Sequence, residues 1–197
     1  MNAALMEHQA QFRSVDAALR FYCDGNTAAY ETSSMSDLIG GSRPDGNGLG
    51  GLDGAGERGI IGSNLATMPQ LWRRLLLAKF TKPEIPCYCL RSCCSKFKIN
   101  GAWAYEIAYI SETVMVDLTA PLLRQKPILR EDIIGRFCNR RYAGEKLTNA
   151  QIAKRHEISE RTVQSYSSSI CGMLKTEYQR AYSSFDERLR TAKVVGE

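Results

Sequence analysis

The stretch LTNAQIAKRHEISERTVQSYSSSICGMLK, residues 147–175, predicts two helices joined by a tight turn. Thr148 can cap the first helix, and Gln151, three residues on, completes a capping-box pattern. Ser159 can cap a second helix that begins at Glu160. Apolar residues then recur along the second helix at the spacing of one buried face. The spacing is that of a helix-turn-helix pair.

The residues between the two caps have the sizes that such a pair requires. Ala153 is small, which allows the second helix to cross close to the first. Ile152, Ile158 and Val163 form an apolar wedge that fixes the angle between the helices. Glu157 occupies the turn position where a left-handed glycine is commonest, and we expect it to adopt that conformation at a cost of about 1 kcal/mol.

The outer face of the second helix carries side chains that can read DNA. Arginine and glutamine make paired hydrogen bonds to guanine and adenine edges, while threonine and serine suit phosphates or a thymine methyl group. Two basic residues of the first helix would lie near a phosphate backbone. The alternative is a helix pair inside a bundle that touches no DNA. The predicted DNA-contacting residues are Lys154, Arg155, Arg161, Thr162, Gln164, Ser165 and Ser168.

The region of residues 127–175, which contains ILREDIIGRFCNRRYAGEKLTNAQIAKRHEISERTVQSYSSSICGMLK, resembles the region-four domain of bacterial sigma factors. It is also similar to the sigma-like modules of small phage regulators, including late-gene antitermination proteins of the Q type. The match covers about a quarter of the chain, and its motif is specific for the helix-turn-helix class. No segment resembles the other regions of a sigma factor, which disfavours a complete one.

The resemblance implies a transcription regulator of phage or prophage origin. Its partners would be double-stranded DNA and bacterial RNA polymerase, and its role would be late-gene antitermination or activation. The location implied is the cytoplasm of a bacterial host, which agrees with a chain start that has no secretory apolar run. A different class of function is also open, a helical adaptor that binds a protein partner such as RNA polymerase without reading DNA.

A second feature is the cysteine-rich stretch PCYCLRSCCSK, residues 86–96. In a reducing cytosol, clustered cysteines more often bind metal than form disulfides, although loose reduced thiols are a further alternative. Four thiolates can complete the tetrahedral shell of a zinc ion. If the adjacent pair points apart, three of them bind, with His8, His156 or a distant cysteine as the fourth ligand. The predicted zinc ligands are Cys87, Cys89, Cys93 and Cys94.

The charge distribution suits a nucleic-acid partner. The chain carries a net charge of +5. Residues 66–101 hold seven basic residues against one acidic, and residues 121–197 hold fifteen against nine. A basic surface favours binding to phosphate backbones, but an ordinary solvent-exposed surface can carry the same charges without a nucleic-acid partner. No apolar run approaches the length of a membrane span, and no catalytic constellation appears, so we expect neither a membrane protein nor an enzyme.

The fold class predicted is all-α: a helical bundle with a C-terminal helix-turn-helix and a cysteine-rich loop. Apolar residues recur at helical spacing through most of the chain, and strands have little support. Ten glycines within residues 40–62 predict a flexible linker. Pro127 is well placed in the first turn of a helix that carries apolar residues as far as Tyr142. The expected segments are an N-terminal helical segment (1–39), the glycine-rich linker (40–62), a helical region with the zinc loop (63–126) and the DNA-binding domain (127–197).

Overall fold

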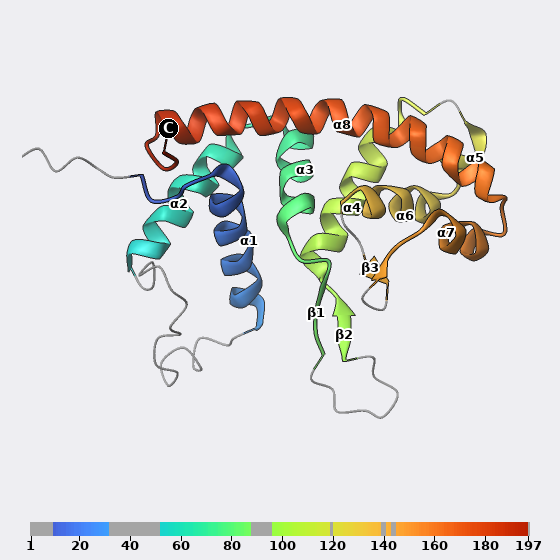
Figure 1. Ribbon diagram of the computed structural model, residues 1–197, viewed down its shortest axis with the longest axis horizontal. Coiled ribbons are helices and arrows are strands. Elements are labelled where there is room, and N and C mark those ends of the chain that lie inside the picture. The colour runs from blue at the N-terminus through green and yellow to red at the C-terminus, as the bar shows by residue number, and fades with distance from the viewer. Residues whose placement is uncertain are drawn as a thin grey trace, which may run out of the picture. The chain divides into compact units, whose positions relative to one another are not determined.

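The protein is all-α, as its sequence predicts. The computed structural model describes residues 10–31, 52–87, 96–118, 120–138, 141–142 and 145–196. Within these residues it forms eight helices and two short hairpins (Figure 1). The chain divides into two compact units, residues 1–68 with 182–197, and residues 69–181. These boundaries differ from those of the four expected segments. None of the helices in the described residues combines the length and apolar character that a membrane span requires.

The first unit contains α1 (Val15–Glu31), α2 (Leu52–Ala66) and the end of α8 (Glu160–Thr191). The chain end closes against the start of α1: the N–H of Phe12 donates to the carbonyl of Val194 at 3.0 Å, and the N–H of Gly196 donates back to Phe12 at 3.1 Å. The core is formed by the three helices together with residues that follow α2 and α8. Its buried side chains include Val15, Leu19, Ile61, Leu65, Met68, Phe185, Leu189 and Val195.

The predicted glycine-rich linker is wrong for its second half. Residues 52–62 belong to α2, while residues 40–51 lie outside the described residues. Two apolar side chains of α2, Ile61 and Leu65, are almost completely buried. Gly62 lies so close to α1 that a Cβ there would be 3.2 Å from the ring of Tyr22. Tertiary packing therefore stabilises a helix that glycine disfavours locally.

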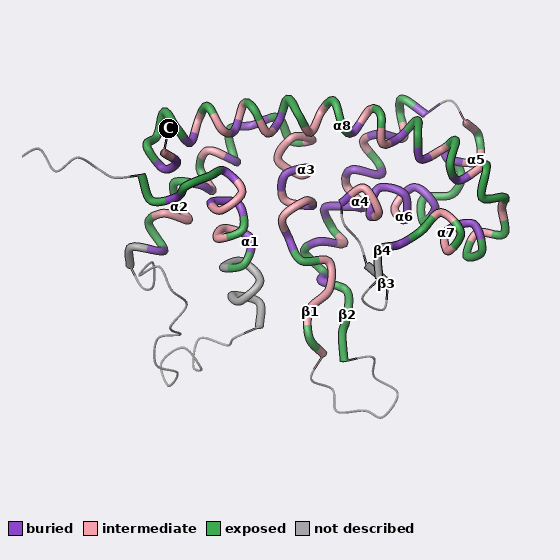
Figure 2. The backbone as a smooth tube through the Cα atoms, in the orientation of Figure 1, coloured by how far each residue is buried: buried purple, intermediate pink, exposed green. Residues whose placement is uncertain are grey.

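The second unit contains α3 (Gln70–Phe80), α4 (Gly101–Met115), α5 (Pro121–Gln125), α6 (Pro127–Phe137), α7 (Asn149–His156) and the start of α8. A single apolar core joins these helices, and Figure 2 shows buried positions along α3, α4 and α6. Its buried residues include Leu75, Trp103, Ile107, Ile110, Leu129, Ile133, Ile152, Val163, Ile170 and Leu174.

Helix α6 begins at Pro127, in agreement with the sequence, but it is shorter than predicted. It ends at Phe137, and Tyr142 belongs to a strand instead. Proline lacks an N–H that the first helical turn would leave unbonded, which explains the start. The described residues also contain two short hairpins that the sequence did not indicate. β1 (Glu84–Pro86) pairs with β2 (Phe97–Ile99), and β3 (Arg141–Tyr142) pairs with β4 (Glu145–Lys146), both antiparallel.

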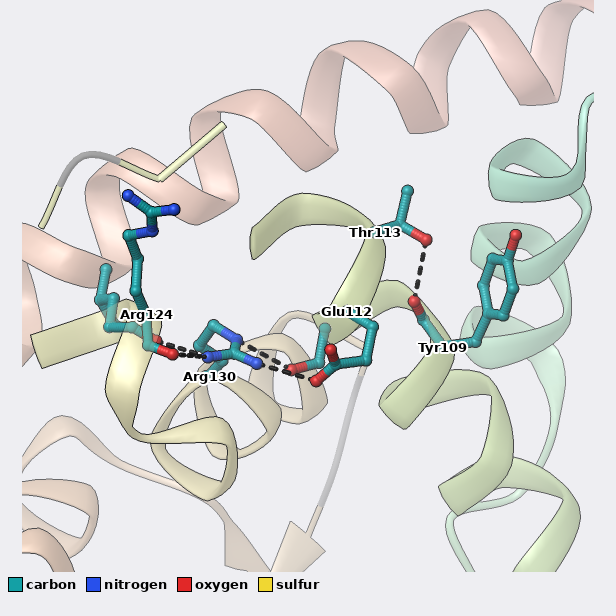
Figure 3. Close-up of polar contacts among 7 residues, drawn as sticks. Tyr109, Glu112, Thr113, Arg124 and Arg130 are labelled. Atoms are coloured by element: carbon teal, nitrogen blue, oxygen red, sulfur yellow. Dashed lines mark hydrogen bonds and ion pairs between the residues drawn. The ribbon is translucent and has the colours of Figure 1, made fainter. Parts of the chain in front are cut away.

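A buried arginine joins α4, α5 and α6. Arg130 is 1% exposed, and its guanidinium donates to Ser111 Oγ at 3.1 Å and to Glu112 Oε1 at 2.9 Å (Figure 3). It also donates to the carbonyl oxygens of Leu123 and Arg124, which lie in the last turn of α5. The carbonyls at a helix end have no partner within the helix, and this arginine supplies donors to two of them.

Candidate nucleic-acid interface

The first helix of the predicted pair, α7, is fixed by local hydrogen bonds at both ends. The N–H of Gln151 donates to Thr148 Oγ1 at 3.2 Å, and the N–H of Thr148 donates to Gln151 Oε1 at 2.9 Å. This is the predicted capping box. At the other end, Glu157 adopts the predicted left-handed conformation, with φ of 55° and ψ of 43°. The N–H of Ile158 then donates to the carbonyl of Ala153 at 3.1 Å, which closes the turn.

The second helix, α8, begins at Glu160, as predicted. Ser159 Oγ accepts from the N–H of Thr162 at 3.1 Å, so serine caps the helix. The wedge is also in place: Ile152 and Val163 are fully buried, and Ile158 is packed against the same core. The angle between α7 and α8 is therefore held by apolar contacts on the inner side and by two capped ends.

The predicted DNA-contacting residues of α8 differ in how free their side chains are to bind a ligand. Arg161, Gln164 and Ser165 are exposed on the first two turns. By contrast, the Thr162 hydroxyl lies 2.7 Å from Ser159 Oγ, and Ser168 donates to the carbonyl of Gln164 at 3.0 Å. These two hydroxyls therefore take part in the helix's own bonding. The side chains best placed to contact a base edge are those of Arg161 and Gln164.

On α7, the two predicted basic contacts also differ. Lys154 is exposed, whereas Arg155 forms a paired contact with the carboxylate of Asp132, at 2.9 and 3.0 Å. His156 Nε2 lies 2.9 Å from the same carboxylate. Asp132 is 1% exposed and belongs to α6, so it ties the end of α7 to the helix beneath. Arg155 thus has a structural role that the sequence did not indicate.

A second polar contact joins the same two helices at the opposite end of α7. Arg136 of α6 donates to the side-chain oxygen of Asn149, the first residue of α7. The two contacts hold both ends of α7 against α6. Sequence reasoning missed both Asp132 and Arg136, because charged residues in a basic region suggest a solvated surface, and only the helix packing shows that they face inward.

The predicted zinc site lies mostly outside the described residues. Of its four ligands, Cys89, Cys93 and Cys94 fall in residues 88–95, which the structure does not describe. The N–H of Cys87 donates to the carbonyl of Lys96 at 2.8 Å, so the two residues that flank this segment are joined. Zinc binding stays a prediction. Among the residues that are described, no group of three or more His, Cys, Asp and Glu side chains could hold a metal ion.

The alternative ligands proposed from the sequence have other surroundings. His8 lies outside the described residues, and His156 contacts Asp132. Burial, with a smaller contribution from the nearby Cys171, raises the pKa of the Cys138 thiol to about 12 against the opposing effect of Lys79. Burial also raises the pKa of Cys171, against the opposing effect of Arg136. Cys138 lies in the apolar core of the second unit, and Cys171 is packed against that core.

Comparison with known proteins adds no assignment. No protein-family model matches the chain, and comparisons with curated proteins and with solved structures found no significant match.

Proposed function

We propose that the protein is a sequence-specific DNA-binding transcription regulator that inserts the start of α8 into a major groove. The observation that carries the proposal is the α7–α8 pair, in which both helix starts are capped, the turn is closed by a left-handed Glu157, and polar side chains occupy the exposed first turns of α8. In proteins that bind DNA with two helices in this order, the first turns of the second helix contact base edges.

The contacts divide into two kinds. Arg161 and Gln164 read base edges, with arginine suited to guanine and glutamine to adenine. Lys154 contacts the phosphate backbone from α7, where the side chain is exposed. Thr162, Ser165 and Ser168 contribute short polar contacts to phosphates, and the methyl group of Thr162 can make an apolar contact with a thymine methyl group. Arg155 acts indirectly, because its contact with Asp132 keeps α7 in place beneath the DNA.

The more specific role rests on the resemblance of residues 127–175 to sigma region four and to small phage regulators. It is the control of late genes with bacterial RNA polymerase, by antitermination or by activation. The charge supports a nucleic-acid partner, since residues 121–197 hold fifteen basic residues against nine acidic. Transcription in vitro through a terminator, with and without the protein, distinguishes antitermination from activation at a promoter.

The proposal includes one zinc ion held by Cys87, Cys89, Cys93 and Cys94. The hydrogen bond between Cys87 and Lys96 supports it, since it brings together the ends of the segment that carries the other three cysteines. Elemental analysis of protein purified without chelator should find about one zinc per chain. Cys93→Ser should abolish the metal and lower thermal stability, whereas Cys171→Ser should retain the metal.

Selection of duplex DNA from a random library tests the DNA-binding proposal. The selected duplexes should share a short motif, and their affinity should fall with salt at a log–log slope of roughly −0.9 for each phosphate contact. Arg161→Ala should cost about 1–3 kcal/mol on the selected duplex and relax the motif at one position. Lys154→Ala should weaken all duplexes alike and reduce the salt slope by about 1.

The matched control is Gln179→Ala, which removes an exposed glutamine from a later turn of the same helix and should leave binding unchanged. A library that yields no shared motif, with affinities unaffected by Arg161→Ala, would overturn the proposal. In that case the adaptor function would be favoured, because an apolar protein interface depends little on salt.

A further inference from the structure

The β1–β2 hairpin exposes apolar side chains on one of its faces. Phe97 is 57% exposed and Ile99 54% exposed. The register pairs Pro86 with Phe97 and Glu84 with Ile99, so these four side chains share one face of the hairpin. Lys98, paired with Ile85, lies on the other face. Figure 1 shows the hairpin extending from the ends of α3 and α4, and β2 is exposed along its whole length in Figure 2.

The base of the hairpin is rigidly attached to the helices. Asn100, 4% exposed, accepts from the N–H of Ala102 at 3.0 Å and so caps α4. Its side-chain amide donates to the carbonyl of Lys82 at 2.9 Å, and its backbone N–H donates to that of Pro83 at the same distance. These bonds order the base of the hairpin, and an ordered backbone loses less entropy when a partner binds.

The two outer edges of the hairpin differ in the backbone hydrogen-bonding groups that they present. The hydrogen bonds from Cys87 to Lys96 and from Asn100 to Pro83 show which residues point inward. By alternation, Pro86 on β1 and Ile99 on β2 direct their backbone groups outward. Proline has no N–H, so β1 cannot donate at that position, whereas Ile99 presents both an N–H and a carbonyl along the edge of β2. Within the part of the chain that the structure describes, no strand other than β1 pairs with β2, so an additional strand can bond to it at Ile99.

The charges of Lys98 and Glu84 limit which partners can pair with β2. If a second copy of the chain paired through β2 around its central residue, Lys98 would face the Lys98 of that copy, and like charges directly opposite each other are destabilising. Nucleic acid fits poorly as well, because the face of Phe97 and Ile99 carries the carboxylate of Glu84, while Lys98 points to the other face. The residue opposite Lys98 should therefore be acidic, and its neighbours apolar.

We propose that the outer edge of β2 docks an extended segment of a protein partner, in which an acidic side chain faces Lys98 and flanking apolar side chains cover Phe97 and Ile99. Main-chain hydrogen bonds at Ile99 supply affinity, and the alternation of apolar and acidic residues supplies specificity. This surface is independent of the proposed DNA-binding surface on α7 and α8.

A display library of short peptides, selected on the full-length protein, tests the inference. The selected peptides should alternate apolar and acidic residues, and binding should protect the Ile99 amide from hydrogen exchange. Lys98→Glu should lower the affinity of such a peptide about tenfold or more, and replacing the peptide's central acid by lysine should restore it. Ile99→Pro, which gives β2 the same missing N–H that Pro86 gives β1, should abolish binding.

The control is Ile128→Ser, which removes an apolar side chain of similar exposure from α6 and should leave peptide affinity unchanged. Circular dichroism checks that Ile99→Pro still folds, and Lys98→Glu tests the surface without altering the backbone. The inference is overturned if no peptide is selected, or if the selected peptides are insensitive to both variants. It is also overturned if Ile99→Pro instead removes binding of a single-stranded oligothymidine or removes self-association in sedimentation. Duplex DNA binding should survive both variants, so failure here leaves the proposed function standing.

Discussion

Helices α2 and α7 form for opposite reasons. α7 has only eight residues, yet a capping box begins it and a left-handed residue ends it. α2 has fifteen residues, four of them glycine, and little in its sequence favours a helix. What stabilises α2 is the burial of Ile61 and Leu65. The comparison teaches that short local signals can mark where a helix begins and ends, while another helix can depend on contacts that no local pattern reveals.

The largest effect should come from removing the burial on which α2 depends. Leu65→Ala should destabilise the protein by about 2–5 kcal/mol, because it leaves a cavity where a side chain is 1% exposed. Denaturant unfolding measures this, and hydrogen exchange should show the loss concentrated in α2. Ile60→Ala, at a 41% exposed position of the same helix, is the matched control and should change stability by no more than about 0.5 kcal/mol. Equal effects of the two variants would show that α2 is not held by packing.

A smaller effect should follow from loosening the attachment of α7. Asp132→Asn removes the charge that Arg155 and His156 share, and we expect a loss of about 1–3 kcal/mol, since hydrogen bonds to charged groups contribute in that range. The same substitution at Asp186, which pairs with Arg190 on the surface of α8, should cost at most about 0.5 kcal/mol. Thermal unfolding of the two variants measures both losses of stability. Equal losses would show that Asp132 contributes no more than a surface ion pair.

The turn between α7 and α8 should gain stability from glycine. Glu157→Gly should stabilise the protein by about 1 kcal/mol, because glycine adopts a positive φ without strain. Lys154→Gly, in the helical part of α7, should destabilise it by about the same amount. Chemical denaturation measures the change in the free energy of unfolding for both variants. Changes of opposite sign would support the assignment of the turn, and a loss of stability in both variants would contradict it.

The smallest effect concerns the glycines of α2. Gly59→Ala should stabilise the helix by about 0.5–1 kcal/mol, since alanine is the better helix former and a Cβ at this position meets no atom within 4 Å. At Gly62 the new Cβ would lie 3.2 Å from the Tyr22 ring, so the ring must shift and the gain should be reduced or reversed. Melting temperatures of the two variants decide this, and a larger gain at Gly62 would be inconsistent with the close approach of α1.

Much of the second unit could be predicted because its signals are local. Thr148, Gln151 and Ser159 are caps, Pro127 begins α6, and the position of Glu157 in the turn implies its backbone conformation. Each of these follows from a residue and its immediate neighbours. The all-α class was predictable for the same reason, since apolar residues recur at helical spacing along the chain.

Other features depend on residues far apart in the chain. Asp132 contacts Arg155 and His156, which lie more than twenty positions away in the sequence, so no local pattern reveals these contacts. The strands β1 and β2 are three residues long, too short for an alternating pattern to stand out. In α2, glycine content indicated a linker because the burial that opposes it comes from other helices. The predicted zinc ligands Cys89, Cys93 and Cys94 lie outside the described residues, so that prediction still depends on the sequence.

The central claim is that the first turns of α8 enter a major groove. Guanine N7 lies in that groove, and methylation interference on a selected duplex reports contacts to it directly. We predict that methylation of at least one guanine blocks binding of the wild-type protein, and that Arg161→Ala removes this interference at one guanine while Lys154→Ala leaves the pattern intact. Interference confined to minor-groove adenine N3, or a pattern that Arg161→Ala does not change, would contradict the claim.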